Sequence, residues 1–174
     1  MQALLFILTA LFSLVVIAFL LRVLMPLVRA DFRNPFGEAI LKVTNPLVLP
    51  LRRFLPPGKR VDPSTLVALL VVQFAGTALL RVLAGGGFQL ESILLGGLYG
   101  LLHTVLQFYF FAVLVYALLS WFAGAAYNPA AQILSRLVEP LLTPIRRVIP
   151  PLGGLDLSAV FLLIALQALQ ILLR

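Results

Sequence analysis

Residues 45–57 of the sequence read NPLVLPLRRFLPP, and residues 139–151 read EPLLTPIRRVIPP. A constant shift of 94 residues aligns the two stretches without a gap and also matches residues on either side of them. The matched pairs are Asn34 and Asn128, Pro35 and Pro129, Pro46 and Pro140, Leu47 and Leu141, Pro50 and Pro144, Arg52 and Arg146, Arg53 and Arg147, Pro56 and Pro150, Pro57 and Pro151, Asp62 and Asp156, Ser64 and Ser158, and Gln73 and Gln167. Most of these residues are polar, charged or proline, so a shared apolar composition cannot produce the match. The sequence therefore predicts an internal repeat.

The composition around this repeat is that of a membrane protein. Of the 174 residues, 62% are hydrophobic and 11% are charged, and the mean hydropathy is +1.12. A soluble domain carries about 45–50% apolar and about 25% charged residues. This chain has too little polar surface to cover a water-soluble core. It has no cysteine, which excludes disulfides and thiolate metal sites, and its single histidine excludes a three-histidine metal site within one chain.

Four apolar segments are candidates for membrane-spanning helices. A span needs about 20 mostly apolar residues, because the hydrocarbon core is about 30 Å thick and each helical residue rises about 1.5 Å. The expected spans cover about residues 3–28, 64–84, 93–121 and 157–173, and the helix of the last and shortest is expected to begin at Asp156. The fold class predicted is an all-α membrane protein with four transmembrane helices.

The basic residues predict the orientation of these spans. The chain has a net charge of +7, and ten of its thirteen Lys and Arg residues lie between spans one and two or between spans three and four. The positive-inside rule then places loops 29–62 and 122–156 in the cytoplasm and both termini outside, in a multi-pass protein of the bacterial inner membrane.

Each of these loops has the pattern of a short amphipathic helix at the membrane interface. Asn34 suits a helix N-cap and Pro35 the first helical position, while Asp62 can cap the span that follows the loop. Pro46 and Pro50 are expected to prevent the loop helix from continuing straight. The apolar face expected in the first copy contains Phe36, Ile40, Val43 and Leu47.

The repeat also sets the expected domain organisation. Residues 1–84 form the first repeat with its amphipathic loop at 34–60, residues 85–92 form a glycine-rich connector, and residues 93–174 form the second repeat with its loop at 128–154. A unit with two spans returns the chain to its starting side. The repeats are therefore expected to be parallel and related by a pseudo-two-fold axis along the membrane normal.

The tandem pattern of a span, Asn-Pro, an amphipathic helix, P-L-x-x-P-[LI]-R-R-x-[LI]-P-P and a downstream Asp-x-Ser resembles the YggT family, called YlmG in cyanobacteria and plastids. The resemblance covers nearly the whole chain. It implies a small integral membrane protein connected with osmotic and potassium homeostasis, with division and nucleoid organisation or, in plastids, with haem attachment to cytochrome b6. The second copy departs from the first at residues 152–154, where Leu-Gly-Gly replaces the Gly-Lys-Arg of residues 58–60.

The arginine pairs are the leading candidates for a binding site. Arg52, Arg53, Arg146 and Arg147 stand in proline-framed segments that would converge on the cytoplasmic face. Arginine can donate two hydrogen bonds to a phosphate or a carboxylate, which favours anionic phospholipids and a protein partner as ligands. The competing interpretation, given more weight, is that these residues only fix topology and bind lipid headgroups.

Polar residues within the spans form a second candidate set. Gln73 and Gln167 are expected near the middle of the bilayer, where they would either bond neighbouring helices or line a cation path. No acidic residue lies mid-span, which disfavours a cation path. His103 and Gln107 share a helical face, and His103 is expected near the outer surface. Arg22 is expected to reach the inner interface or to pair with Asp31.

The function expected from these observations is non-enzymatic. The sequence has no triad, paired intramembrane carboxylates, zinc motif or phosphate loop, and it implies no cofactor. A scaffold at the membrane face, linked to osmotic stress, cell division or the biogenesis of a membrane complex, is the leading hypothesis. Its partners would be lipid and an unidentified membrane or division-associated protein, with a homodimer as a further candidate and no direct nucleic-acid binding. A channel or transporter component affecting potassium balance is the alternative, and a cytochrome assembly factor is a third.

Overall fold

The computed structural model describes residues 2–30, 32–56, 58, 61–121, 129–148 and 156–173, with the backbone alone described at residues 121, 129 and 130. All regular secondary structure in these ranges is helical, as the sequence predicts. The helices are α1 (Gln2–Leu27), α2 (Pro35–Leu51), α3 (Pro63–Leu83), α4 (Leu90–Trp121), α5 (Pro129–Arg146) and α6 (Leu157–Leu172).

Three of these helices, α1, α3 and α4, are long and apolar enough to cross a membrane. The fourth expected span is α6, an apolar helix of 16 residues with Asp156 at its N-cap rather than inside it. At about 1.5 Å per residue it is about 24 Å long, slightly less than the thickness of the hydrocarbon core. The chain is therefore compatible with a multi-pass membrane protein.

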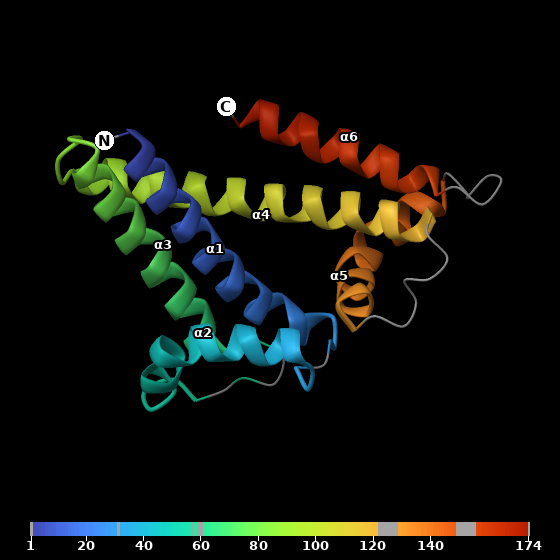
Figure 1. Cartoon of the computed structure of the whole chain (residues 1–174), viewed down its shortest axis with the longest axis horizontal. Coiled ribbons are helices and arrows are strands. Elements are labelled where there is room, and N and C mark those ends of the chain that lie inside the picture. The colour runs from blue at the N-terminus through green and yellow to red at the C-terminus, as the bar shows by residue number, and fades with distance from the viewer. Residues whose placement is uncertain are drawn as a thin grey trace.

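The long helices pack in pairs. Figure 1 shows α1 beside α3 and α4 beside α6, while α2 and α5 lie at the ends of these pairs, away from the N-terminus. Helix α2 contacts both α1 and α3, and α5 contacts both α4 and α6. Each half of the chain therefore contains one long pair that is joined at one end by a shorter helix.

Contacts between the halves are not reciprocal. Helix α3 packs against α4, whereas α6 and α1 make no comparable contact in the described ranges, and α5 reaches α1 without an equivalent contact between α2 and α4. A two-fold axis would require each contact to occur twice. The expected pseudo-two-fold relation is therefore wrong for these helices. The two halves contact each other through two different surfaces, α3 of the first and α4 of the second.

A shared apolar cluster joins the two loop helices to the end of α1. Ile40 from α2, Met25 from α1 and Leu137 from α5 are all at most 5% exposed and belong to this cluster. Arg136 of α5 also donates a hydrogen bond to the carbonyl oxygen of Arg29, at 2.5 Å. These contacts hold α2 and α5 as one unit at the same end of the bundle.

The prolines that are expected to prevent a straight loop helix lie inside continuous helices. Helix α2 continues through Pro46 and Pro50, and α5 continues through Pro140 and Pro144. A proline leaves the carbonyl four residues earlier without its hydrogen bond. Each pair of prolines is four residues apart and lies on the exposed side of its helix, where water or lipid headgroups can bind the freed carbonyls.

The face of α2 that is buried in the protein differs from the apolar face expected at the membrane interface. Ile40 belongs to both, but Phe36 and Val43 are 42% and 54% exposed. Gly37 and Thr44 take their place among the buried residues of α2. An added Cβ at Gly37 would lie 2.6 Å from the Cα of Phe32, so only glycine allows this backbone contact.

Gly97 provides the closest approach between α4 and α3. A Cβ at this residue would lie 2.4 Å from Cδ1 of Phe74, whereas a Cβ at the neighbouring Gly96 would have 3.7 Å of room. We therefore expect Gly97→Ala to lower the free energy of unfolding by about 1–3 kcal/mol in bicelles, the usual cost of overpacking. Gly96→Ala is the matched control and should be neutral or slightly stabilising, since alanine favours helix. Equal effects of the two substitutions on the unfolding midpoint would contradict this packing.

Candidate functional site

The first arginine pair stands where α2 ends, close to the start of α3. Arg52 donates hydrogen bonds from Nε and Nη2 to Oδ2 of Asp62, at 3.0 and 2.6 Å. Asp62 is the N-cap of α3, and its Oδ1 accepts from the backbone N–H of Ser64 at 3.1 Å. The Ser64 hydroxyl in turn donates to the carbonyl oxygen of Leu55 at 2.7 Å. Arg52 thus fastens the end of the loop helix to the start of the following span.

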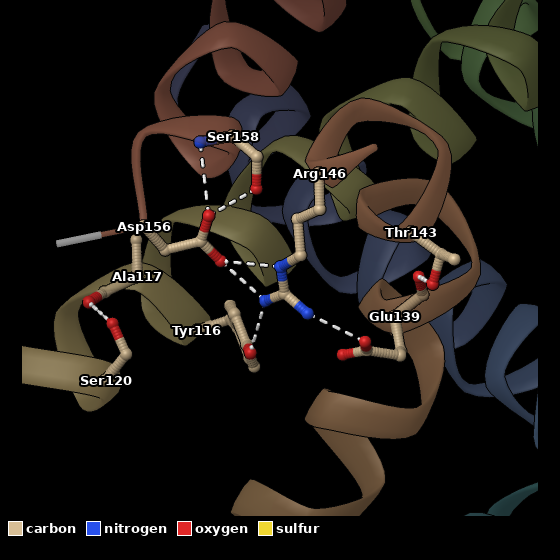
Figure 2. Close-up of polar contacts among 8 residues, drawn as sticks. All are labelled: Tyr116, Ala117, Ser120, Glu139, Thr143, Arg146, Asp156 and Ser158. Carbon is tan, nitrogen blue, oxygen red and sulfur yellow. Dashed lines mark hydrogen bonds and ion pairs between the residues drawn. The ribbon is translucent and has the colours of Figure 1, made fainter. Parts of the chain in front are cut away.

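The second copy repeats these contacts. Figure 2 shows Arg146 donating from Nε and Nη2 to Oδ2 of Asp156, at 3.0 and 2.5 Å. Asp156 is the N-cap of α6, and its Oδ1 accepts from both the backbone N–H and the hydroxyl of Ser158. All three residues lie 94 positions after their counterparts in the first copy. The bonds from arginine to the N-cap aspartate, and from the serine N–H to that aspartate, therefore recur in both loops, whereas the serine hydroxyl has a different acceptor in each.

Arg146 has two further partners in Figure 2. Its Nη1 donates to Oε1 of Glu139 at 2.7 Å, and its Nη2 donates to the hydroxyl of Tyr116 at 2.9 Å. These residues join α4, α5 and the N-cap of α6 through one guanidinium. Sequence reasoning did not single out either partner, although the shift of 94 residues aligns them with Arg22 and Asn45.

The ion pairs shift the pKa values of their members. Partial burial alone would raise the pKa of Asp62 and Asp156, but hydrogen bonds from the paired arginine and from Thr65 or Ser158 outweigh it, so both carboxyls have pKa values below the usual one. Burial would lower the pKa of Arg146, but Asp156 and Tyr116 outweigh it and raise that pKa. The carboxylates and the guanidinium therefore stay charged at neutral pH.

The second arginine of each pair is placed differently. Arg53 and Arg147 are exposed, and their side chains make no ion pair or hydrogen bond within the described ranges. The pairs thus divide into one arginine that caps a helix junction and one whose guanidinium faces outward. Asn34 caps α2 as expected, accepting from the backbone N–H of Gly37 at 2.9 Å. Four of the matched motif residues (Pro57, Asn128, Pro150 and Pro151) lie outside the described residues.

The two span glutamines are not brought together. Gln73 is 2% exposed, and its Nε2 donates to the carbonyl oxygen of Gly97 at 3.1 Å. Gln167 is exposed and has no hydrogen-bond partner among the described residues. Gln107 is exposed as well, and His103 is stacked on Tyr99 with 6.1 Å between the ring centroids. The described ranges contain no group of three or more potential metal-ligating His, Asp or Glu residues.

Arg22 occupies an unexpected environment. Its side chain is 4% exposed, and Nη1 donates to Oγ1 of Thr44 at 2.5 Å and to Oδ1 of Asn45 at 2.9 Å. The expected partner Asp31 lies outside the described residues. The arginine therefore fixes α1 to α2 through neutral acceptors.

Comparison with known proteins places these features in a wider group. The family described as CCB3/YggT matches residues 1–83 and 95–174. A Pseudomonas aeruginosa protein described as uncharacterised is 39% identical over 173 residues, which cover 98% of this chain and 87% of that protein. The Escherichia coli K12 protein named YggT, also described as uncharacterised, is 34% identical over 171 residues, or 98% of this chain and 88% of that protein.

A shorter relative matches only part of the chain. The protein ycf19 of Guillardia theta is 35% identical over 66 residues, which make up 37% of this chain and 72% of that relative. The relative is therefore about half as long as this chain. No solved structure matches this chain significantly.

Proposed function

The chain belongs to the CCB3/YggT family, and from this premise we propose that it is a non-enzymatic four-span scaffold of the bacterial inner membrane. Its spans are α1, α3, α4 and α6, in two parallel repeats. Loops 29–62 and 122–156 face the cytoplasm. There the paired loop helices α2 and α5 bind anionic lipid headgroups and a membrane or division-associated protein.

Two observations support the arrangement of spans and repeats. The contacts of Arg52 with Asp62 recur as those of Arg146 with Asp156, including the N-cap of the following helix. A relative about half as long as this chain is also consistent with a single repeat as the ancestral unit. The scaffold acts in osmotic stress, cell division or the biogenesis of a membrane complex, the settings that the family resemblance implies.

The observation that carries the proposed binding role is the division within each arginine pair. Arg52 and Arg146 are engaged by Asp62 and Asp156, so they hold the loop geometry. Arg53 and Arg147 are exposed beside them with unpaired guanidiniums. A rigid frame that presents a charge outward suits a phosphate ligand, which arginine binds with two parallel hydrogen bonds.

Substitution of the outward arginines tests this role. In nanodiscs that contain phosphatidylglycerol, we expect Arg53→Gln and Arg147→Gln each to reduce retention of that lipid about fivefold, since a basic group near the surface gains about 1 kcal/mol from anionic lipid. Native mass spectrometry of lipids bound after extraction gives the measurement. Unchanged retention in the double variant would overturn the proposed lipid contact.

Position and orientation need their own controls. Lys42→Gln removes an exposed positive charge from the middle of α2 and should change retention less than Arg53→Gln does. Since the chain has no cysteine, single cysteines at residues 53 and 147 report topology. Both should react with an impermeant maleimide only from the cytoplasmic side, and reaction from outside would contradict the orientation.

The channel alternative has less support. A path lined by the two glutamines would need them to approach each other, but Gln73 is buried against α4 while Gln167 is exposed on α6. An ion flux through liposomes that is lost in the variant Gln73→Leu/Gln167→Leu would nevertheless favour a channel over the scaffold.

A further inference from the structure

The contact between α3 and α4 joins the two halves of the chain. Gln73 donates from Nε2 to the carbonyl oxygen of Gly97 at 3.1 Å. Phe74 lies against the same glycine, and Nε2 of Gln73 would lie 2.9 Å from a Cβ added at Gly100. A large side chain on α3 thus fits a glycine surface on α4, with one amide hydrogen bond between the helices.

The residues that correspond to this contact under the shift of 94 residues lie on α6 and α1, where they form no such contact in the described ranges. Gln73 and Phe74 of α3 correspond to Gln167 and Ala168 of α6, and Gly97 and Gly100 of α4 correspond to Ala3 and Phe6 of α1. These four residues of α6 and α1 are exposed, and the two helices make no comparable contact within the chain.

Gln167 is unusual on the exposed face of α6. A lipid-facing helix needs only apolar side chains there, as at Ile164, which is 62% exposed on the same helix. Gln167 instead presents an amide with no hydrogen-bond partner in the described ranges. Hydrocarbon cannot bond an amide, so a partner that offers a carbonyl is favoured there.

The corresponding residues on α6 and α1 differ in size from those on α3 and α4. Within the chain, the large residue is Phe74 on α3, and the small residues are Gly97 and Gly100 on α4. On the open faces, the small residue is Ala168 on α6, and the large residue is Phe6 on α1, which is 74% exposed. In a contact of α6 with α1, Ala168 would meet Ala3 as Phe74 meets Gly97, and Phe6 would lie beside Gln167 as Gly100 lies beside Gln73.

We propose that a second copy of this chain covers this face, with α6 of one copy packed on α1 of the next as α3 packs on α4. The Gln167 amide then donates to a backbone carbonyl near Ala3 of the second copy, Ala168 lies against Ala3, and Phe6 lies beside Gln167. The inference rests on the proposed four-span, two-repeat arrangement. Such a contact joins unlike surfaces, so it links copies head to tail.

The half-length relative supports this type of assembly. The 66 residues that match this chain are 72% of the Guillardia theta protein. A chain with a single repeat can make contacts between repeats only with another chain.

Cysteine crosslinking tests the proposal directly, because the chain has no cysteine of its own. Differently tagged Ala3→Cys and Ala168→Cys chains, expressed together and oxidised in native membranes, are expected to form a disulfide-linked heterodimer. Neither variant expressed alone should crosslink, because each cysteine would face an alanine. Leu98→Cys expressed with Ala168→Cys is the matched control, since Leu98 is 61% exposed beside Gly97 and belongs to no proposed contact.

The crosslinking outcomes are distinct. The Phe74→Cys/Gly97→Cys double variant should form an intrachain disulfide, which confirms that oxidation reaches this depth. With that disulfide formed, absence of the heterodimer, or equal crosslinking of Leu98→Cys, would overturn the proposed dimer. The lipid retention experiment on Arg53 and Arg147 would be unaffected by that failure, so the two proposals can fail separately.

The glutamine has a separate role that can be measured. Gln167→Leu is expected to lower the association constant of the copies about threefold, the usual effect of one hydrogen bond between membrane helices. Fluorescence energy transfer between labelled chains at rising lipid dilution measures that constant. Gln107→Leu, which removes an exposed amide from α4, is the control and should leave it unchanged. The same association constant for wild type, Gln167→Leu and Gln107→Leu would show that Gln167 makes no contact between copies.

Discussion

Replacing Thr44 with valine and Asn45 with leucine is expected to lower the free energy of unfolding by about 3–5 kcal/mol. Both side chains accept hydrogen bonds from Arg22, whose own side chain is 4% exposed. Valine and leucine would leave its guanidinium buried with neither acceptor. Thermal or denaturant unfolding in bicelles, followed by circular dichroism, measures the change.

A rescue variant separates the buried charge from simple repacking. Adding Arg22→Met to the double variant removes the charge, so most of the lost stability should return. Thr143→Val is the control for the threonine substitution, because that hydroxyl is exposed and bonds only the carbonyl oxygen of Glu139. Its effect should stay below about 0.5 kcal/mol, the usual range for surface substitutions. A triple variant no more stable than the double variant would show that Arg22 is not the cause.

Asp156→Ala is expected to cost about 2–3 kcal/mol of unfolding free energy. Removing an N-cap costs about 1 kcal/mol, and a hydrogen bond to a charged group contributes about 1.5–3 kcal/mol. The second contribution is reduced because the Arg146 side chain is 27% exposed. Asp156→Asn keeps an oxygen for the cap and should lose less. A loss in Asp156→Asn as large as in the alanine variant would show that the cap contributes nothing.

The effect of Asp156→Ala should also depend on pH. Because the pKa of this carboxyl is lower in the folded chain than its usual value of 3.8, its contribution is present above that pH and is lost as the pH falls through the folded value. Wild type and variant should therefore differ between about pH 5 and 8 and converge in strong acid. A difference in stability that stays constant as the pH falls from about 5 into strong acid would contradict the ionic origin.

Several features of the fold follow directly from local sequence signals. Asn34-Pro35 and Asp62-Pro63 mark the starts of α2 and α3, and Asp156 marks that of α6, because side-chain oxygens at these positions bond free backbone N–H groups. Long apolar runs predict the long helices. These signals depend only on neighbouring residues, so one sequence is enough to find them.

Other features depend on residues that are distant in the sequence. The path of α2 through Pro46 and Pro50 depends on which side of the helix is exposed, and the buried face depends on the close approach of Gly37 to Phe32. The partners of Arg146 come from α4 and α5 as well as from the N-cap of α6. The identity of one residue does not reveal which distant side chains it will contact.

The candidate site shows the same limit. The sequence predicts that the arginine pairs matter, but it treats Arg52 and Arg53 as equivalent. Their difference arises from the direction in which each side chain leaves the last turn of α2: Arg52 reaches Asp62, while Arg53 is exposed. The repeat shift could have indicated Tyr116 and Glu139, because it aligns these polar residues with Arg22 and Asn45.

The shared cluster of Ile40, Met25 and Leu137, together with the bond from Arg136 to the Arg29 carbonyl, has a mechanical consequence. A pull on α2 is transmitted through the end of α1 to α5, because tightly packed side chains resist compression. A protein that binds and moves either loop helix, α2 or α5, would therefore displace both together.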